Sequence, residues 1–223
     1  MMNMTATVAE REIAINFVNE MMRRGFADVW RESDFRSDVY CWYCEAGFTH
    51  DRGYDYASGE TKHVFFMEDL ERWVIKVASR DSYQRDWCQR EFQNYCAAVN
   101  EKLGFYFAAM EPLITISGFT FYLQEKVFCD EGVDGELFDT LKEDYESSGT
   151  DYDVDSLYNE IDDMDASERV YTLYGNSELA AFISEHRIND LHSGNFGLRD
   201  GMYIIVDYSG FGQAAWGPIV EEV

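Results

Sequence analysis

The stretch NDLHSGNFGLRDGMYIIVDYSG, residues 189–210, decides the first expectation about the fold. Its segments NFGL and MYIIV have the pattern of short strands, and the Asp200-Gly201 pair between them is a strong tight-turn signal. A hairpin folded at this turn brings Asn195, where one strand starts, close to Asp207, where the other ends. Oxygen ligands of this kind suit Mg²⁺ held against phosphates. The sequence therefore predicts a metal site at the open end of the hairpin.

An amphipathic helix is predicted at the N-terminus. Thr7 and Glu10 form a capping-box pair ahead of an apolar stripe at helical spacing, and Gly25 ends the pattern. We therefore interpret residues 1–37 as an N-terminal helical extension.

The middle of the chain alternates between strand and helix patterns. A helix is expected from about Ser82 to Leu103, because its apolar residues fall on one stripe and Gly104 can end it. Strand patterns are found in DVYCWYC (38–44), KHVFFME (62–68), RWVIKVA (72–78) and, as two strands around Gly118, LITISGFTFYLQEKV (113–127). The predicted order is three strands, one helix and two strands. Further along, NSELAAFISEHRI (176–188) predicts a helix capped by Asn176 or Ser177.

The charge of the chain limits its partners. The formal net charge is −25, which repels phosphate backbones and makes direct nucleic-acid binding unexpected. Residues 130–166 hold fifteen acids and a single lysine, Lys142, so we interpret them as an insertion or a solvated helical excursion that could contact a protein partner. No apolar run approaches the roughly 18 residues of a membrane span, and the N-terminus does not resemble a signal peptide. We expect a soluble, cytoplasmic protein without membrane contact.

The cysteines and one acidic motif favour structural explanations. Five cysteines at scattered positions suit reduced, mostly buried thiols, so CWYC (41–44) is interpreted as core cysteines of a strand, in preference to a redox pair. DYDVDSLYNEID (151–162) has acids at three places of a calcium loop, but Ser156 replaces the turn glycine and Asp162 the bidentate glutamate. A solvated acidic loop is the favoured interpretation.

The order of motifs resembles the protein-kinase-like family. DLHSGN (190–195) matches the catalytic loop D-L-x-x-x-N, DYS (207–209) stands where the family has D-F-G, and WVIK (73–76) resembles V-A-I-K. The His in the catalytic loop is similar to that of aminoglycoside-phosphotransferase-type and other atypical kinases. Only sixteen residues follow Asp207, so the resemblance is to a minimal bacterial or phage-type kinase, truncated after the D-F-G equivalent.

This resemblance implies roles for individual residues. Asp190 would orient or deprotonate the acceptor hydroxyl, and Asn195 and Asp207 would be the metal ligands. Lys76 would hold the nucleotide phosphates. Glu91 lies at the edge of the apolar stripe of its helix, where an unpaired carboxylate would be costly to bury, and an ion pair with Lys76 resolves that cost.

The resemblance also implies a binding region for the adenine base. ASGETKHV (57–64) lies over the glycine-rich loop register. Gly59 is the kept glycine, Ala57 and Lys62 replace the other two, and Val64 lies over the base. LQEKV (123–127) resembles the hinge, where backbone groups of Glu125 and Val127 would bind the adenine ring. The implied cofactors are ATP and Mg²⁺.

Together these patterns predict an α+β protein with a two-lobed, protein-kinase-like fold. Residues 38–127 would form a nucleotide-binding lobe with a small antiparallel sheet and a helix, and residues 128–223 a reduced helical lobe with the acidic segment and the catalytic-loop hairpin. The leading hypothesis is a Mg²⁺/ATP-dependent phosphotransferase with an unknown acceptor. The alternative is a catalytically idle pseudokinase or an acidic interaction module that acts as an inhibitor or nucleic-acid mimic.

Overall fold

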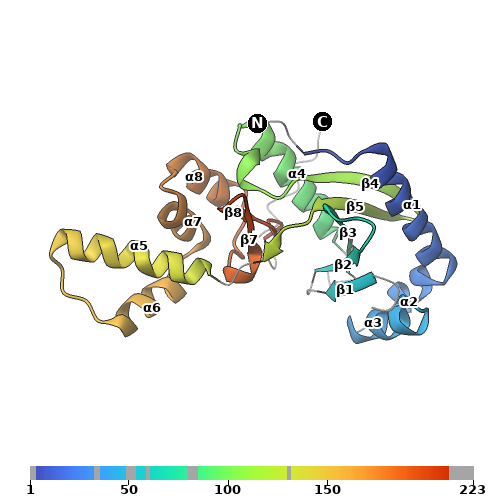
Figure 1. Ribbon diagram of the computed structural model, residues 1–223, viewed down its shortest axis with the longest axis horizontal. Helices are drawn as coiled ribbons and strands as arrows, with labels where there is room; N and C mark the ends of the chain where they lie inside the picture. Colours follow the sequence, from blue (N-terminus) through green and yellow to red (C-terminus); the bar gives the residue numbers. More distant parts are fainter. Residues whose placement is uncertain are drawn as a thin grey trace. The chain divides into compact units, whose positions relative to one another are not determined.

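The computed structural model describes residues 4–32, 36–48, 54–58, 61–79, 85–129 and 132–210. The chain is α+β and divides into two compact units, shown in Figure 1. Unit 1 comprises Met1–Cys96 and Ala108–Lys126, and unit 2 comprises Ala97–Phe107 and Val127–Val223. None of the helices in the described part of the chain is long and apolar enough to cross a membrane.

Unit 1 is built on a five-stranded antiparallel sheet with the order β1-β2-β3-β5-β4. The strands are β1 (Tyr54–Ser58), β2 (Lys62–Met67), β3 (Trp73–Ala78), β4 (Met110–Ile116) and β5 (Phe119–Glu125). Helix α4 (Trp87–Asn100) connects β3 to β4. The strands predicted at 62–68, 72–78 and within 113–127 and the helix between them are confirmed, whereas the predicted first strand is a helix and β1 was not predicted.

The segment 38–44, predicted as a strand, lies in helix α3 (Arg36–Glu45). Val39 and Tyr43 are four residues apart and both 2 % exposed, so the buried positions follow helical spacing. The strand prediction was wrong because a run of aromatic and β-branched residues suits either period over so short a window. Cys41 is exposed and Cys44 half-buried, which also contradicts their interpretation as core cysteines.

Helices cover both faces of the sheet in unit 1. The part of α4 up to Cys96 packs on one face, where the ring centroids of Phe92 and Tyr122 are 5.8 Å apart. The other face meets α1 (Val8–Arg23), α2 (Phe26–Glu32) and α3 (Figure 1). There the ring of Phe26 lies 6.1 Å from that of Phe65 and 5.9 Å from that of Phe121. Because both faces are covered, the side chains Trp73 to Val77 of β3 are all buried.

Polar contacts fasten the N-terminal helix to the sheet. The predicted capping box of Thr7 and Glu10 is present at the start of α1. Glu10 also accepts hydrogen bonds of 2.8 and 2.9 Å from Arg72, just ahead of β3, and Arg11 pairs with Glu111 of β4. Helix α1, predicted as an N-terminal extension, is therefore part of the packed structure of unit 1.

Unit 2 combines helices with a small sheet of order β6-β7-β8. Its elements are a 3₁₀ turn η2 (Gly104–Tyr106), β6 (Phe128–Cys129), α5 (Val133–Ser148), α6 (Val154–Asp163), α7 (Ala166–Tyr174), α8 (Ser177–Glu185), a second 3₁₀ turn η3 (Ser193–Asn195), β7 (Phe196–Arg199) and β8 (Met202–Ile205). The predicted helix is α8, capped by Asn176, which accepts from the amides of Glu178 and Leu179. The predicted hairpin is β7–β8, and its turn residues Asp200 and Gly201 have φ of 53° and 79°.

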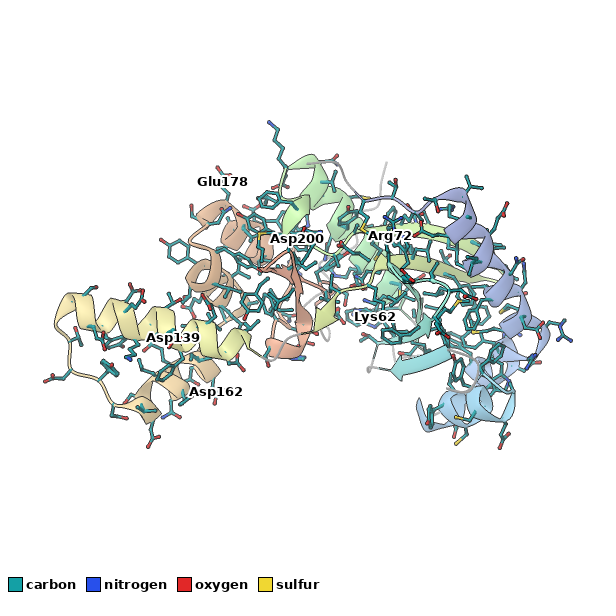
Figure 2. The ribbon with its side chains drawn as sticks, in the orientation of Figure 1. Lys62, Arg72, Asp139, Asp162, Glu178 and Asp200 are labelled. Carbon is teal, nitrogen blue, oxygen red and sulfur yellow. The ribbon has the colours of Figure 1, made fainter. Side chains whose placement is uncertain are left out.

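The described part of the acidic segment is helical, as one of its two interpretations expected, but one side of its helices is buried and not solvated. Within its described part, α5 buries Val133, Leu137 and Leu141, and α6 buries Leu157 and Ile161. Residues 151–162 form neither a calcium loop nor an open acidic loop, because Asp153 caps α6, which starts at Val154. Most of the acids in the described part of the segment are exposed, among them Asp139 and Asp162, which are labelled in Figure 2. The large number of acids predicted a solvated segment. The apolar residues at helical spacing between the acids instead bury one side of each helix.

Candidate functional site

Lys76 of β3 and Glu91 of α4 form a buried ion pair in unit 1. The Lys76 Nζ lies 3.0 Å from Oε1 and 3.2 Å from Oε2 of Glu91, and the two residues are 4 % and 0 % exposed. A buried carboxylate without a partner would destabilise the fold. Lys76 provides the partner that the buried position of Glu91 requires. The two side chains predicted to pair do so.

Two further side chains contact the same carboxylate. Gln124 of β5 donates from Nε2 to Glu91 Oε1 over 3.0 Å, and Lys62 Nζ of β2 lies 3.5 Å from Glu91 Oε2. We call Lys62, Lys76, Glu91 and Gln124 the Glu91 cluster. From the sequence, Lys62 was expected only to replace a glycine of the loop. Its position two residues before Val64, which stands opposite Lys76, was the signal that places both lysines on one face of the sheet.

Burial near the Glu91 cluster raises the pKa values of two neighbouring groups, Cys88 and Asp86. Burial raises the pKa of the Cys88 thiol well above its ordinary value, one turn before Glu91 on α4. Burial also raises the pKa of Asp86, whose Oδ1 accepts from the Gln89 amide over 2.8 Å. Cys88 is therefore held as a neutral thiol and is unsuited to act as a nucleophile.

Of the four residues predicted to bind the adenine base, three lie within the described part of the chain. Val64 is half-buried on β2, and Gly59 lies outside the described residues. The Glu125 amide donates to the Ala109 carbonyl over 2.7 Å, and the Glu125 carboxylate accepts from the Ala109 amide over 3.0 Å. The amide of Glu125 is thus engaged within the sheet. A role for Glu125 and for the half-buried Val127 in binding a base stays a prediction.

The segment 188–195 of unit 2 is anchored by its apolar residues. Ile188 and Leu191, on either side of Asp190, are 1 % and 4 % exposed, whereas Asp190 itself is half-buried. Asn195 donates from Nδ2 to the Asp190 carbonyl over 2.6 Å, so its Oδ1 is the atom left for a cation. His192 Nδ1 accepts from the Gly194 amide over 3.1 Å, which closes the loop locally.

The hairpin brings the two predicted metal ligands to the same end. Phe196 pairs with Ile205, and the Val206 amide donates to the Asn195 carbonyl over 2.8 Å, so Asp207 follows directly. The hydroxyl of Ser209 donates to Asp207 Oδ1 over 3.2 Å. Tyr208 was missed by the sequence analysis.

Tyr208 anchors the segment that carries Asp207. It is 0 % exposed, and its ring lies 5.1 Å from that of Phe107 in an edge-on arrangement. An aromatic residue flanked by two polar ones is the signal that could have indicated this anchor.

The donor set of unit 2 suits a hard cation that is also held by a ligand. The described residues contain no group of three or more His, Cys, Asp or Glu side chains that could hold a metal ion. Asn195 and Asp207 contribute oxygen atoms only. Mg²⁺ keeps several waters and binds through one or two protein oxygens plus substrate phosphates, so these two residues fit it better than a metal that needs a complete protein cage.

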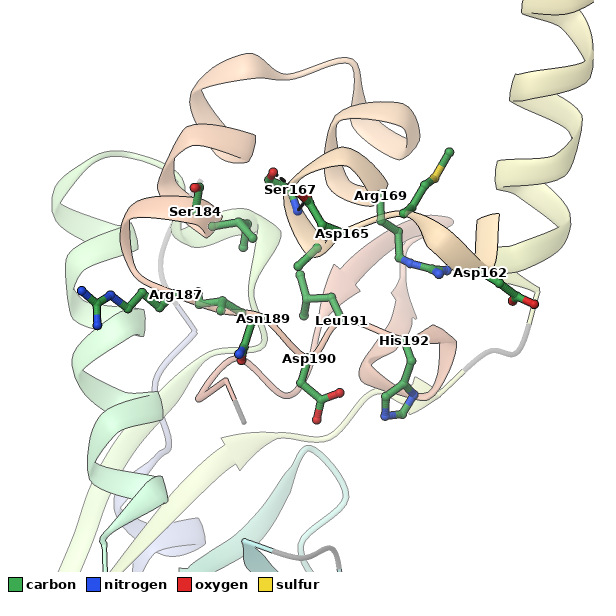
Figure 3. A pocket seen from close by; sticks show the side chains of 14 residues that line it. Asp162, Asp165, Ser167, Arg169, Ser184, Arg187, Asn189, Asp190, Leu191 and His192 are labelled. Atoms are coloured by element: carbon green, nitrogen blue, oxygen red, sulfur yellow. Dashed lines mark hydrogen bonds between the residues drawn. The ribbon is translucent and has the colours of Figure 1, made fainter. Parts of the chain in front are cut away.

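A pocket of about 510 Å³ adjoins Asp190 in unit 2. It is formed by the α6–α7 connection, the start of α7, the end of α8 and the segment 187–192. The charged or polar residues around it include Asp162, Asp165, Arg169, Asn189, Asp190 and His192. Figure 3 shows the side chains of Asp190 and His192 on the side of the loop away from Ser167 and Ser184. The pocket offers hydrogen-bonding groups of both charges to a polar molecule.

Arg169 is the most buried cation of this pocket. It is 8 % exposed, donates to Asp134 Oδ1 over 2.8 Å and to the Ile161 carbonyl over 2.8 Å. Its guanidinium therefore ties α7 to α5 and α6. The sequence pattern could not reveal this pocket, because it joins residues from 162 to 192 that only the folded chain brings together.

Comparisons of this chain with protein-family models, with curated proteins and with solved structures found no match.

Proposed function

We propose that the protein is a minimal kinase-like phosphotransferase that uses ATP and Mg²⁺, with an acceptor still to be identified. The observation that carries this proposal is the buried Lys76–Glu91 pair, in which both carboxylate oxygens lie within 3.2 Å of one ammonium. A lysine immobilised in this way offers a fixed positive charge, and placing such charge on phosphates is the main protein contribution to phosphoryl transfer.

The proposal divides the roles between the two units. Lys76 binds the phosphates, Glu91 positions Lys76, and the region of Gly59, Val64, Glu125 and Val127 receives the base. In unit 2, Asn195 Oδ1 and the Asp207 carboxylate hold Mg²⁺, which neutralises phosphate charge when bound.

Asp190 acts on the acceptor side in this proposal. The acceptor hydroxyl oxygen forms a bond to the γ-phosphorus while the bond from that phosphorus to the leaving oxygen of ADP breaks. Asp190 accepts the hydroxyl proton, as a general base does. Two features support this assignment: the half-buried position of Asp190 and the pocket of about 510 Å³ beside it, which has room for a small polar acceptor.

A thermal-shift experiment with and without Mg²⁺ tests the nucleotide site. At roughly a hundred times its dissociation constant, ATP adds about 2.7 kcal/mol, which raises the melting temperature by about 5 to 10 °C in a protein of this size. We expect this rise with Mg²⁺ and its loss with EDTA or in Asp207→Asn. A flat response of the wild type with Mg²⁺ and millimolar ATP would contradict the proposal.

A second candidate function, an acidic interaction module, is favoured by a different pocket of unit 2. This pocket of about 490 Å³ is lined by the apolar parts of Leu141, Met164 and Tyr171 and by the acids Glu160, Asp163 and Glu168, with no Lys or Arg among its lining residues. Tyr171 is 55 % exposed. Apolar side chains surrounded by carboxylates suit a lysine or arginine side chain of a basic peptide. The aliphatic part of such a side chain packs on apolar surface, and its charged end pairs with the carboxylates.

Binding of a basic peptide distinguishes this second candidate. We expect a lysine-rich peptide, but not a glutamate-rich one, to bind the wild type with an affinity that falls as salt is raised. Tyr171→Ala and Asp163→Asn should weaken binding, while Tyr40→Ala, at an exposed aromatic of unit 1, should not. Equal binding by all these variants would place the interaction outside this pocket.

A further inference from the structure

The two lysines of the Glu91 cluster come from neighbouring strands and reach the same carboxylate. Lys76 Nζ lies 3.0 Å from one oxygen of Glu91, and Lys62 Nζ lies 3.5 Å from the other. The lysine residues are 4 % and 3 % exposed, respectively. Figure 2 places Lys62 at the sheet of unit 1. Two ammonium groups are thus held side by side within the core.

The hydrogen bonds of Glu91 favour Lys76 over Lys62. Oε1 accepts from Lys76 and from Gln124, each over 3.0 Å, and Oε2 lies 3.2 Å from Lys76. The 3.5 Å separation between Lys62 and Oε2 is an ion-pair distance, longer than the usual range of a hydrogen bond. Glu91 therefore fixes Lys76 tightly and holds Lys62 beside it.

The register of the sheet explains how the lysines can act together. Val64 stands opposite Lys76, and Lys62 stands opposite Ala78, so both lysine side chains project from the same face. They occupy diagonal positions on adjacent strands, whose Cα atoms are typically about 7 to 8 Å apart. Long side chains span that distance easily, and successive phosphoryl groups of a nucleotide are spaced closely enough to be contacted by both.

We propose that Lys62 is a second phosphate-binding residue, so that unit 1 holds a nucleoside diphosphate or triphosphate with two buried ammonium groups. This inference rests on the proposed nucleotide binding and adds a residue to it. A phosphate offers oxygens that accept from both lysines, and its negative charge offsets the repulsion between the two ammonium groups. Glu91 prepares both lysines for that ligand.

Calorimetry with ADP, AMP and adenosine in the presence of Mg²⁺ tests Lys62 directly. A charged hydrogen bond to phosphate corresponds to about a 10- to 100-fold change in affinity, so Lys62→Met should weaken ADP binding by that factor. Adenosine binding should stay unchanged, because adenosine has no phosphate. Lys62→Arg should recover part of the loss. Lys142→Met, at a half-exposed lysine of unit 2, is the matched control and should bind ADP as the wild type does.

The outcomes separate this inference from the proposed function. Wild-type protein that binds no ADP overturns the proposed function and the inference with it. Wild-type ADP binding that is lost in Lys76→Met but fully kept in Lys62→Met overturns the inference alone. Equal losses of ADP and adenosine affinity in Lys62→Met would show a structural role, and would also overturn it.

An acyl-phosphate derivative of ATP tests the wild-type protein without substitution, in case Lys62→Met does not fold. After the lysine loses a proton to solvent, its nitrogen attacks the acyl carbon, the bond between that carbon and the phosphate oxygen breaks, and ATP leaves. Mass spectrometry then identifies the acylated lysines. We expect acylation of both Lys62 and Lys76, suppressed by excess ATP, whereas acylation of Lys76 without Lys62 would contradict the inference.

Discussion

The two units place their charged residues differently. In unit 1, the Glu91 cluster is fully inside the protein, with Lys62, Lys76 and Glu91 each at most 4 % exposed. In unit 2, the acids lie mainly on the outer faces of α5 and α6, and Asp190 is only half-buried on its loop. The candidate residues of unit 1 are thus buried within a sheet, and those of unit 2 lie on a more accessible loop.

Because of this difference, we expect substitutions of charged residues in unit 1 to change both stability and ligand binding. In unit 2 they should change binding or catalysis alone. A charge inside the core is stabilised only by its partners, so removing one partner affects both the fold and any ligand. A charge on the surface is solvated, so its removal changes binding or catalysis with little change in stability. Each of the following variants tests this contrast.

Asp190→Asn gives the largest expected effect, and it acts on chemistry alone. If Asp190 accepts the proton of the acceptor hydroxyl, phosphate transfer falls by about 10²- to 10⁴-fold. ATP affinity and the melting temperature should change little, because no hydrogen bond within the described chain involves the Asp190 carboxylate. Radiolabelled transfer, beginning with autophosphorylation, and calorimetry measure the two quantities. Full transfer by the variant would exclude Asp190 as the base.

Glu91→Ala should lower the free energy of unfolding by about 3 to 5 kcal/mol, because it leaves two buried ammonium groups without their shared carboxylate. Urea unfolding measures this change. Gln93→Ala, at an exposed position of the same helix, is the control and should change stability by less than about 0.5 kcal/mol.

A double substitution sharpens the interpretation of Glu91. Replacing the pair together, as Lys76→Met with Glu91→Leu, should recover part of the stability lost in Glu91→Ala while abolishing nucleotide binding. If Glu91→Ala is as stable as the wild type, the contrast between a buried and a solvated set of charges does not hold.

Glu10→Gln tests a partly exposed ion pair of unit 1 through its pH dependence. Hydrogen bonds from Arg72 lower the pKa of Glu10 from 4.5 to about 2. Because the folded pKa lies below the unfolded one, this stabilisation is present above about pH 4.5 and is lost as the pH falls towards 2. Arg72 is half-exposed, so solvent screening limits the effect to about 1 kcal/mol or less.

Urea unfolding at pH 7 and pH 3 measures this dependence. We expect the wild type to be more stable than Glu10→Gln at pH 7, with a smaller difference at pH 3. The control Glu12→Gln, at an exposed position of α1, should show neither effect. A difference that grows as the pH falls would contradict the assignment of the Glu10 pKa.

Neutralising the exposed acids of α5 should have the smallest effect. We expect the variant Asp139→Asn, Glu143→Gln, Asp144→Asn and Glu146→Gln to change the free energy of unfolding by less than about 0.5 kcal/mol per site and to leave ATP binding intact. Leu137→Ala, on the buried side of the same helix, should instead lower it by about 2 to 5 kcal/mol. Thermal unfolding and ATP titration of both variants distinguish the two faces.

Local features of the fold could be predicted from the sequence because they depend on interactions between residues that are close in the chain. The capping box of Thr7 and Glu10 needs only residues three apart, and the β7–β8 turn needs only Asp200 and Gly201, which adopt positive φ. For the Lys76–Glu91 pair, the burial of Glu91 required a partner for its carboxylate, and the resemblance of WVIK to V-A-I-K suggested Lys76 as that partner. By contrast, the 38–44 segment was assigned to a strand because its short aromatic run fits both periods.

The sequence by itself therefore determined the caps, the turn, most elements of the sheet and one buried ion pair, because each depends on residues that are close in the chain or on the cost of burying a charge. Tertiary structure decided that residues 38–44 form a helix, that the acidic segment buries a leucine-rich stripe, and that Lys62 and Gln124 reach Glu91. These depend on which faces meet when distant segments pack. Packing selects between helix and strand, and between buried and solvated positions, by the total apolar area removed from water, which no short window of sequence contains.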